Sequence, residues 1–160
     1  MLILGKKDYL FLNMIFSKPW TYAIRALLYL AEHRNEGPIL STTIAESEGI
    51  PAPYLVKILG ILSTAKIVGS TRGPGGGFHL QLDPAKVNLM KVVALFDSVG
   101  LFEECLLGLG RCGDNEDCPI HRRWKEPKRF MMRFLEDTTL ADLVKDAPGR
   151  RRKVLEGRLS

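Results

Sequence analysis

The chain has 160 residues, 46% hydrophobic and 26% charged, which suits one moderate domain or a small domain with an appended second half. Its net charge of +5 suits a polyanionic partner such as nucleic acid, although a basic surface alone is weak support for one. No apolar run reaches the roughly 18 residues of a membrane-spanning helix, and MLILGKKDYLFLN lacks the apolar core of a signal peptide. We therefore expect a cytoplasmic protein with no membrane partner.

The first half of the chain predicts three helices, of which the second is short and the third is longer than the second. Residues 20–32 carry apolar side chains at i, i+3, i+4 and i+7, and Pro19 suits the first turn. In STTIAESEG, Ser41 or Thr43 is the expected cap of a short helix that Gly49 ends. The next helix, in APYLVKILGILST, has these predicted core residues: Leu55, Ile58, Leu59 and Leu62. A short helix, a tight turn and a longer helix have the spacing of a helix-turn-helix, although any three-helix bundle could show it.

A glycine-rich hairpin is expected in IVGSTRGPGGGFHLQL. Phe78, Leu80 and Leu82 alternate with polar residues, which predicts strands on both sides of a turn. The tip from Gly73 to Gly77 is glycine apart from one proline, so we expect it to have no packing role and to bring backbone N–H groups close to a phosphate or a groove wall. A hairpin after a helix-turn-helix is a wing, which this order of elements favours over a merely flexible hairpin.

The second half predicts three further helices. Asn88 should cap the first, and a short last one is expected in TTLADLV. Residues 119–136 also have a helical pattern, in which Pro127 predicts a kink or a division into two shorter helices. The terminal GRRRKVLEGRLS has the composition of a disordered basic tail.

All three cysteines lie in CLLGLGRCGDNEDCPIH, with the spacing C-x6-C-x5-C-x2-H. In a reducing compartment, clustered cysteines bind metal or do redox chemistry more often than they form disulfides. Three thiolates and an imidazole are enough ligands for a [2Fe–2S] or [4Fe–4S] cluster, and they would also form a tetrahedral zinc site. A metal-free thiol sensor is compatible with these residues too. A Cys–His thiol oxidoreductase is disfavoured, because no C-x-x-C pair is present.

Two stretches, YAIRALLYLA and RGPGGGF, are the most specific signals in the sequence. Through them, and from about Met14 to Val144 as a whole, the chain resembles the Rrf-type family of bacterial winged-helix transcriptional regulators. The family has IscR-, NsrR- and CymR-like members. The resemblance implies a mainly α fold with a small β-hairpin wing and a long C-terminal dimerisation helix. It also implies a homodimer, each half of which meets one half of a roughly palindromic DNA operator, and no small-molecule substrate.

The resemblance suggests four segments. Residues 1–13 are an N-terminal extension outside the match, and residues 14–83 are a winged helix-turn-helix. Residues 84–145 hold the linker helix, the cysteine loop and the dimerisation helix, and residues 146–160 are the tail.

Within the resemblance, a set of four residues occupies the positions of cluster ligands: Cys105, Cys112, Cys118 and His121. His121 matches the fourth ligand of IscR-like members. NsrR-like members use an acid at the start of the first helix, where this chain has none, and Glu103 and Glu104 are the substitutes for His121. The resemblance therefore implies a repressor whose DNA affinity depends on an iron–sulfur cluster, [2Fe–2S] in preference to [4Fe–4S], sensing redox, nitric oxide or iron–sulfur status. A cluster-free thiol or zinc-dependent regulator is the alternative.

The predicted DNA contacts are Arg25, Ser41, Pro53, Tyr54, Lys57, Arg72, Gly73, Pro74 and Gly75. Lys57 can donate to guanine or phosphate, and Tyr54 can reach phosphate or stack. Arg72 is the strongest candidate for a minor-groove or phosphate contact, whereas Arg25 suits a phosphate contact and an internal ion pair equally. The second helix of the predicted helix-turn-helix, in APYLVKILGILST, is the expected recognition helix, and its outward face has few polar residues. We therefore expect the wing and DNA shape to supply much of the specificity.

Overall fold

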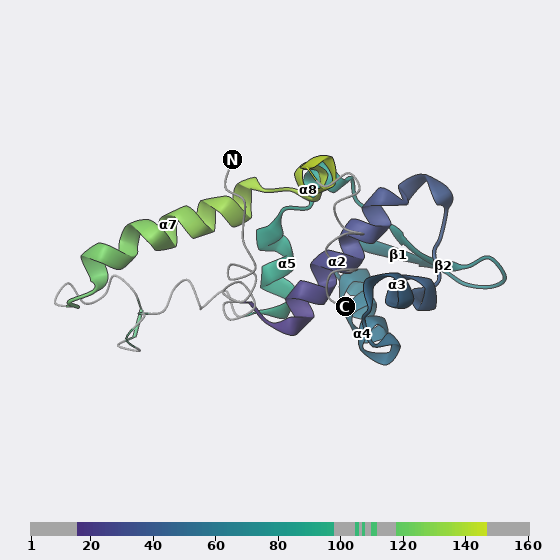
Figure 1. The fold of residues 1–160 in the computed structure, drawn as a ribbon, viewed down its shortest axis with the longest axis horizontal. Helices are drawn as coiled ribbons and strands as arrows, with labels where there is room; N and C mark the ends of the chain where they lie inside the picture. The colour runs from purple at the N-terminus through teal and green to yellow at the C-terminus, as the bar shows by residue number, and fades with distance from the viewer. Residues whose placement is uncertain (1–15, 98–104, 106, 108–109, 112–117, 147–160) are drawn as a thin grey trace, which may run out of the picture.

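The computed structural model describes residues 16–97, 105, 107, 110–111 and 118–146. The predicted extension at residues 1–13 and nearly all of the predicted tail lie outside these residues. Figure 1 shows a helical body with a two-stranded hairpin at one end and a helix that projects at the other. The elements are α2 (Lys18–Glu32), η1 (Arg34–Glu36), α3 (Ser41–Glu48), α4 (Ala52–Thr64), β1 (Val68–Thr71), β2 (Gly77–Leu80), η2 (Pro84–Lys86), α5 (Leu89–Phe96), α7 (His121–Asp137) and α8 (Leu140–Asp146). No helix of the described ranges is both long and apolar enough to cross a membrane.

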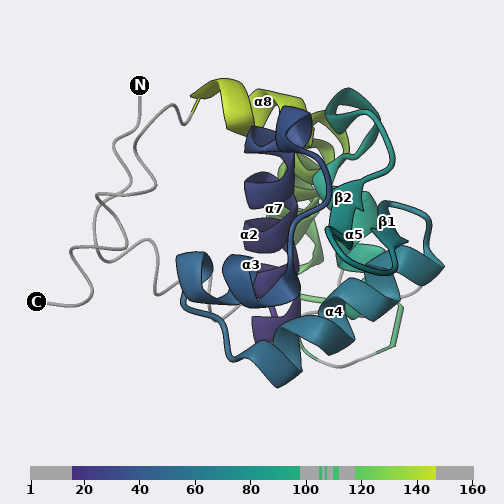
Figure 2. The same cartoon turned by 90° about the vertical axis from the view of Figure 1, so that its right-hand side faces the viewer.

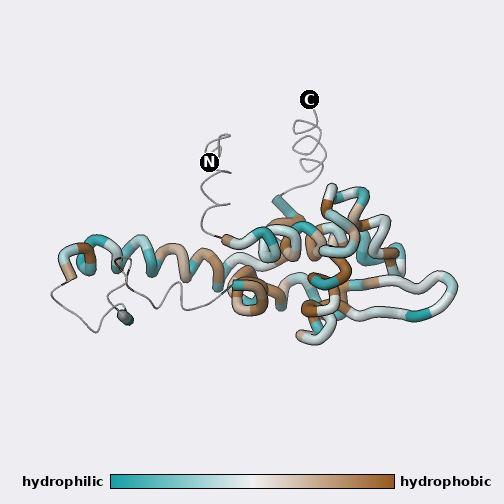
Figure 3. The backbone as a smooth tube through the Cα atoms, turned by 90° about the horizontal axis from the view of Figure 1, so that it is seen from below, coloured by the Kyte–Doolittle hydropathy of each residue, from teal (hydrophilic) through white to brown (hydrophobic). Residues whose placement is uncertain are grey.

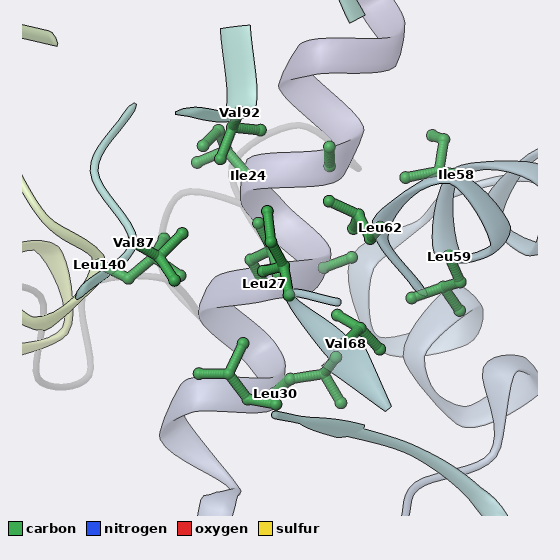
Figure 4. Close-up of a cluster of buried hydrophobic side chains, with 14 of the residues drawn as sticks. Ile24, Leu27, Leu30, Ile58, Leu59, Leu62, Val68, Val87, Val92 and Leu140 are labelled. Atoms are coloured by element: carbon green, nitrogen blue, oxygen red, sulfur yellow. The ribbon is translucent and has the colours of Figure 1, made fainter. Parts of the chain in front are cut away.

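Helix α2 is the centre of the hydrophobic core. Ser17 caps its start by accepting from the Trp20 N–H, and Pro19 lies in its first turn, as predicted. Leu27 and Leu30 are buried among residues of α4 and β1 (Figure 4). Residues of α5 and α8 belong to the same core, so α2 packs against both the helix-turn-helix and the helices that follow the hairpin.

The two helices and the turn of the helix-turn-helix follow one another as predicted, but the predicted cap of the first helix is absent. Helix α3 begins at Ser41 after Leu40, and no side chain caps it, so the expected cap by Ser41 or Thr43 is wrong. Gly49 ends α3 in the left-handed conformation (φ 59°, ψ 39°), and the Ile50 N–H donates to the Ala45 carbonyl, as in a Schellman motif. This turn sets the direction in which α4 begins.

The hairpin is confirmed, and its register pairs Val68 with Leu80 and Thr71 with Gly77. The other edge of β2 pairs with the segment before α3, because Ile39 and Phe78 exchange two backbone hydrogen bonds of 2.8 and 2.7 Å. A Cβ on Gly77 would lie 2.4 Å from the Ile39 carbonyl oxygen. The expectation that the glycine-rich tip has no packing role is therefore wrong at Gly77, where only glycine allows this approach between backbones.

The C-terminal helices are attached to the body at the start of α5. Asn88 caps α5 by accepting from the Lys91 N–H, as predicted, and its amide also donates to the Glu136 carbonyl. Helix α8 begins at a reciprocal cap. The Thr139 hydroxyl and N–H donate to the Asp142 carboxylate, which lowers the pKa of that carboxyl, and the Asp142 N–H donates back to the Thr139 hydroxyl. The last short helix is thus confirmed.

Helix α7 is one helix of 17 residues that contains Pro127. Of the two alternatives predicted for Pro127, the division into two shorter helices is wrong, and the kink stays a prediction. The end of α7 is held to the body by buried Leu135 and by the bonds around Asn88, whereas Figure 1 shows its first turns projecting from the body.

Candidate nucleic-acid interface and metal site

Helix α4 presents its N-terminal half to solvent. Its predicted core residues are all buried: Leu55, Ile58, Leu59 and Leu62. Pro53, Tyr54 and Lys57 are exposed on the first two turns, and Figure 2 shows α4 and α3 next to the hairpin on one side of the molecule. Ser41 is half-buried at the first position of α3 on the same side. The structure thus brings these predicted contacts together on the helix-turn-helix.

Arg25 has an internal partner. Its Nε lies 3.3 Å from Oε2 of Glu48, the last residue of α3, and the Glu48 side chain is only 2% exposed. A buried carboxylate needs such a partner, because desolvation without one is unfavourable. Of the two roles expected for Arg25, the structure therefore supplies the ion pair, which fixes α3 against α2.

Aromatic contacts continue from this ion pair to the start of α4. The Arg25 guanidinium carbon lies 6.0 Å from the centre of the Tyr22 ring, and that ring makes an edge-to-face contact with Tyr54, with centroids 5.7 Å apart. Tyr54 is therefore held in place by residues of α2. Tyr22 and Glu48 are not among the residues predicted from the sequence, because their link to Tyr54 exists only once the three helices are packed.

The wing ends in a defined turn. The Gly76 N–H donates to the Gly73 carbonyl (2.9 Å), with Pro74 and then Gly75 at the central positions, and Gly75 has φ 76°. Proline followed by a positive-φ glycine is the pattern of a type II turn. Arg72 is exposed directly before this turn. The predicted wing residues thus lie together at the tip of the hairpin (Figure 1).

Two of the predicted metal ligands are close together and buried. Sγ of Cys105 and Sγ of Cys118 are 3.6 Å apart, and neither cysteine is in a disulfide. Two thiolates on one tetrahedral metal, each at about 2.3 Å, would be about 3.8 Å apart. The donor set and its spacing therefore fit two ligands of one metal ion, whether the iron of a cluster or zinc.

His121 follows Cys118 by three positions in the chain. It begins α7, its side chain is half-buried, and its N–H donates to the Cys118 carbonyl (3.0 Å). Cys112, Glu103 and Glu104 lie outside the described residues. Among the residues that are described, no three histidine, cysteine or acidic side chains form a metal-binding group.

The two candidate sites lie at opposite ends of the molecule. In Figure 1 the start of α7, next to Cys118, is at the far end of the long axis from the hairpin. Any effect of a metal on the exposed face of α4 must therefore pass through packed helices or through a second copy of the chain.

Comparison with known proteins identifies the kind of molecule. The model of the Rrf2 family, described as iron-dependent transcriptional regulators, matches residues 16–146. An Aquifex aeolicus protein described as an HTH-type transcriptional regulator is 37% identical over 133 residues, covering 82% of this chain and 92% of the relative. The regulator IscR of Vibrio campbellii is 34% identical over 125 residues, covering 78% of this chain and 74% of the relative.

Solved structures have the same fold. IscR of T. potens superposes with a TM-score of 0.66 at 28% identity, covering 82% of this chain and 87% of that one. CymR of B. subtilis gives a TM-score of 0.69 at 24% identity, covering 83% and 98%, and this likeness concerns the fold alone. The predicted winged-helix fold is thus confirmed. The prediction of a transcriptional regulator, in preference to a thiol oxidoreductase or another enzyme, is confirmed as well.

The Arg25–Glu48 pair makes a stability prediction. Replacing Arg25 with methionine leaves the Glu48 carboxylate buried without this partner, and should lower the free energy of unfolding by about 2–3 kcal/mol, somewhat less than for a fully buried pair. Urea denaturation measures the change. The matched variant Arg34→Met, at an exposed position, should stay within about 0.5 kcal/mol of the parent. An Arg25→Met protein as stable as the parent would show that the ion pair is not structural.

Proposed function

This chain belongs to the Rrf2 family of transcriptional regulators, and from that premise we propose that it is a repressor. It binds a palindromic DNA operator as a homodimer, and an iron–sulfur cluster on the three cysteines and His121 sets its affinity. The observation that carries the proposal of a metal centre is the 3.6 Å separation of the buried Cys105 and Cys118 thiols.

The DNA-binding part of the proposal uses α3, α4 and the wing. The first turns of α4 enter the major groove, where Lys57 donates to a guanine edge or a phosphate and Tyr54 is held ready by Tyr22. Arg72 and the Gly73–Gly76 turn meet the adjacent backbone or minor groove. The ion pair between Arg25 and Glu48 contributes to DNA binding by fixing the position of α3.

The homodimer is supported by apolar side chains on α7. Phe130 is 70% exposed and Phe134 is 50% exposed, and residues four apart share one face of a helix. Figure 3 shows hydrophobic positions recurring along this helix outside the main body. Aromatic residues on a projecting helix suit pairing with the same helix of a second copy, which would bury them.

For the cofactor, Cys105 and Cys118 would hold one iron, and Cys112 with His121 would complete the ligand set. When bound, an iron–sulfur cluster supplies a centre that oxidants, nitric oxide or iron shortage can alter. These residues would bring two parts of the chain to one centre, because His121 begins α7 three positions after Cys118, while Cys105 comes from the chain that follows α5. The family description as iron-dependent regulators supports iron.

Zinc is the alternative, because a tetrahedral zinc site has the same sulfur–sulfur separation. A cluster-free, zinc-dependent or thiol-sensing regulator would keep the DNA-binding proposal unchanged. Metal and sulfide analysis distinguishes these cases.

Protein isolated without oxygen from iron-replete cells should contain iron and acid-labile sulfide in equal amounts and should absorb visible light. His121→Ala should lose most of the iron, because it removes one ligand, whereas His33→Ala should keep it, since the His33 ring nitrogen binds the Tyr29 carbonyl. Elemental analysis and absorption spectra are the measurements. Zinc without sulfide would contradict the cluster and establish the zinc-dependent regulator.

Arg72→Ala should weaken binding to a duplex selected from a random library by about 1–3 kcal/mol. The plot of log affinity against log salt should become shallower by about 0.9, the contribution of one phosphate contact. Fluorescence anisotropy at several salt concentrations measures both quantities. Lys145→Ala, an exposed lysine on α8, removes the same charge and should change neither. An unchanged affinity in Arg72→Ala would remove the wing from the interface.

Phe130→Asp should convert the dimer to a monomer, because a carboxylate would be desolvated in the paired face of α7. Sedimentation equilibrium measures the mass. Lys125→Asp introduces the same acid at an exposed position of α7 that carries no aromatic ring, and this variant should remain a dimer. A dimeric Phe130→Asp protein would place the interface elsewhere.

A further inference from the structure

Gly60 is a glycine in the middle of α4. It is the one glycine within the helices of the described chain, and it is exposed. Glycine in a helix interior is less favourable than alanine, because its backbone loses more freedom on folding. A glycine at this position therefore needs a reason that offsets its effect on stability.

The described part of the molecule does not supply that reason. A Cβ built on Gly60 would meet no atom within 4 Å, so packing does not require glycine. Gly60 is not among the positive-φ glycines, and α4 continues through it from Ala52 to Thr64. Neither a turn nor a close approach to another described element accounts for it.

Gly60 lies on the outward stripe of α4. Pro53, Lys57 and Thr64 are seven before, three before and four after it, so they share its side of the helix, and all three are exposed. This stripe is opposite the four buried leucine and isoleucine side chains of α4. The missing side chain therefore leaves a notch at the Gly60 Cα, between Lys57 and Thr64, while the Gly60 carbonyl accepts from the Thr64 hydroxyl (3.0 Å).

We infer that Gly60 is the point at which the backbone of α4 comes closest to DNA. The wall of the major groove fills the notch, and the Lys57 side chain, one turn earlier, can reach the adjacent phosphate or base edge. This inference rests on the proposed DNA-binding function and adds an affinity-determining residue to it. The consequence is that one methyl group at Gly60 affects folding and DNA binding in opposite directions.

The test compares full-length Gly60→Ala with the parent in two measurements. The thermal unfolding midpoint should rise by roughly 1–4 °C, because alanine favours the helix. The affinity for a duplex selected by the parent protein from a random library should fall by about 5- to 150-fold, the range that overpacking by a small group implies. A merely structural glycine could not produce this pair of results.

Ala94→Leu is the control, because Ala94 is an exposed alanine on α5, outside the helix-turn-helix, and the change adds bulk to a helix surface. It should leave the affinity unchanged. An unchanged affinity in Gly60→Ala overturns the inference while the parent still binds DNA, and a lowered midpoint overturns it by revealing an internal role. If the parent selects no duplex at all, the proposed function itself fails.

Discussion

The contact between the Cys105 and Cys118 thiols is the interaction on which the rest of the proposed mechanism depends. It joins two buried sulfur atoms at 3.6 Å across 13 positions of sequence. Closing such a segment reduces chain entropy, and the weak attraction between two thiols offsets little of that. A shared metal would offset it and would fix where α7 begins.

Helix α5 connects the end of α7 to the body that carries the helix-turn-helix. At the end of α5, the Asp97 carboxylate accepts from the Ser17 N–H at the start of α2. At the other end, Asn88 holds the last turn of α7 through the Glu136 carbonyl. Helix α2 in turn carries Arg25 and Tyr22, which contact Glu48 and Tyr54. A displacement of α7 can therefore reach α3 and α4 through hydrogen bonds, an ion pair and core contacts.

Local patterns in the sequence were enough to predict the order of the elements. Leu55 and Leu62 recur with the period of a helix. Gly49 ends one helix and Asn88 caps the start of another, as the local chemistry of each residue favours, and Pro74-Gly75 specifies a turn. These features act within a few residues of each other, so no tertiary information was needed.

The features that could not be predicted depend on distant partners. The need for glycine at Gly77 comes from Ile39, which lies 38 positions earlier in the chain. The choice of Glu48 as the partner of Arg25 depends on how α3 packs on α2. The local pattern around Pro127 was equally compatible with one helix and with two, so the continuity of α7 could not be predicted either. In the candidate metal site, the spacing predicted the ligand types, but only the folded chain brings Cys105 and Cys118 together.

The central claim is that a metal held by these thiols changes the affinity for DNA, and its most direct measurement is the affinity of one preparation with and without its metal. Anisotropy titrations at one fixed salt concentration would compare air-free, metal-loaded protein with the same protein after chelation. The proposed coupling predicts affinities that differ by about 5- to 150-fold, the usual range for linked sites. Equal affinities of the two forms would contradict it, because a metal that binds without changing DNA affinity cannot be the switch.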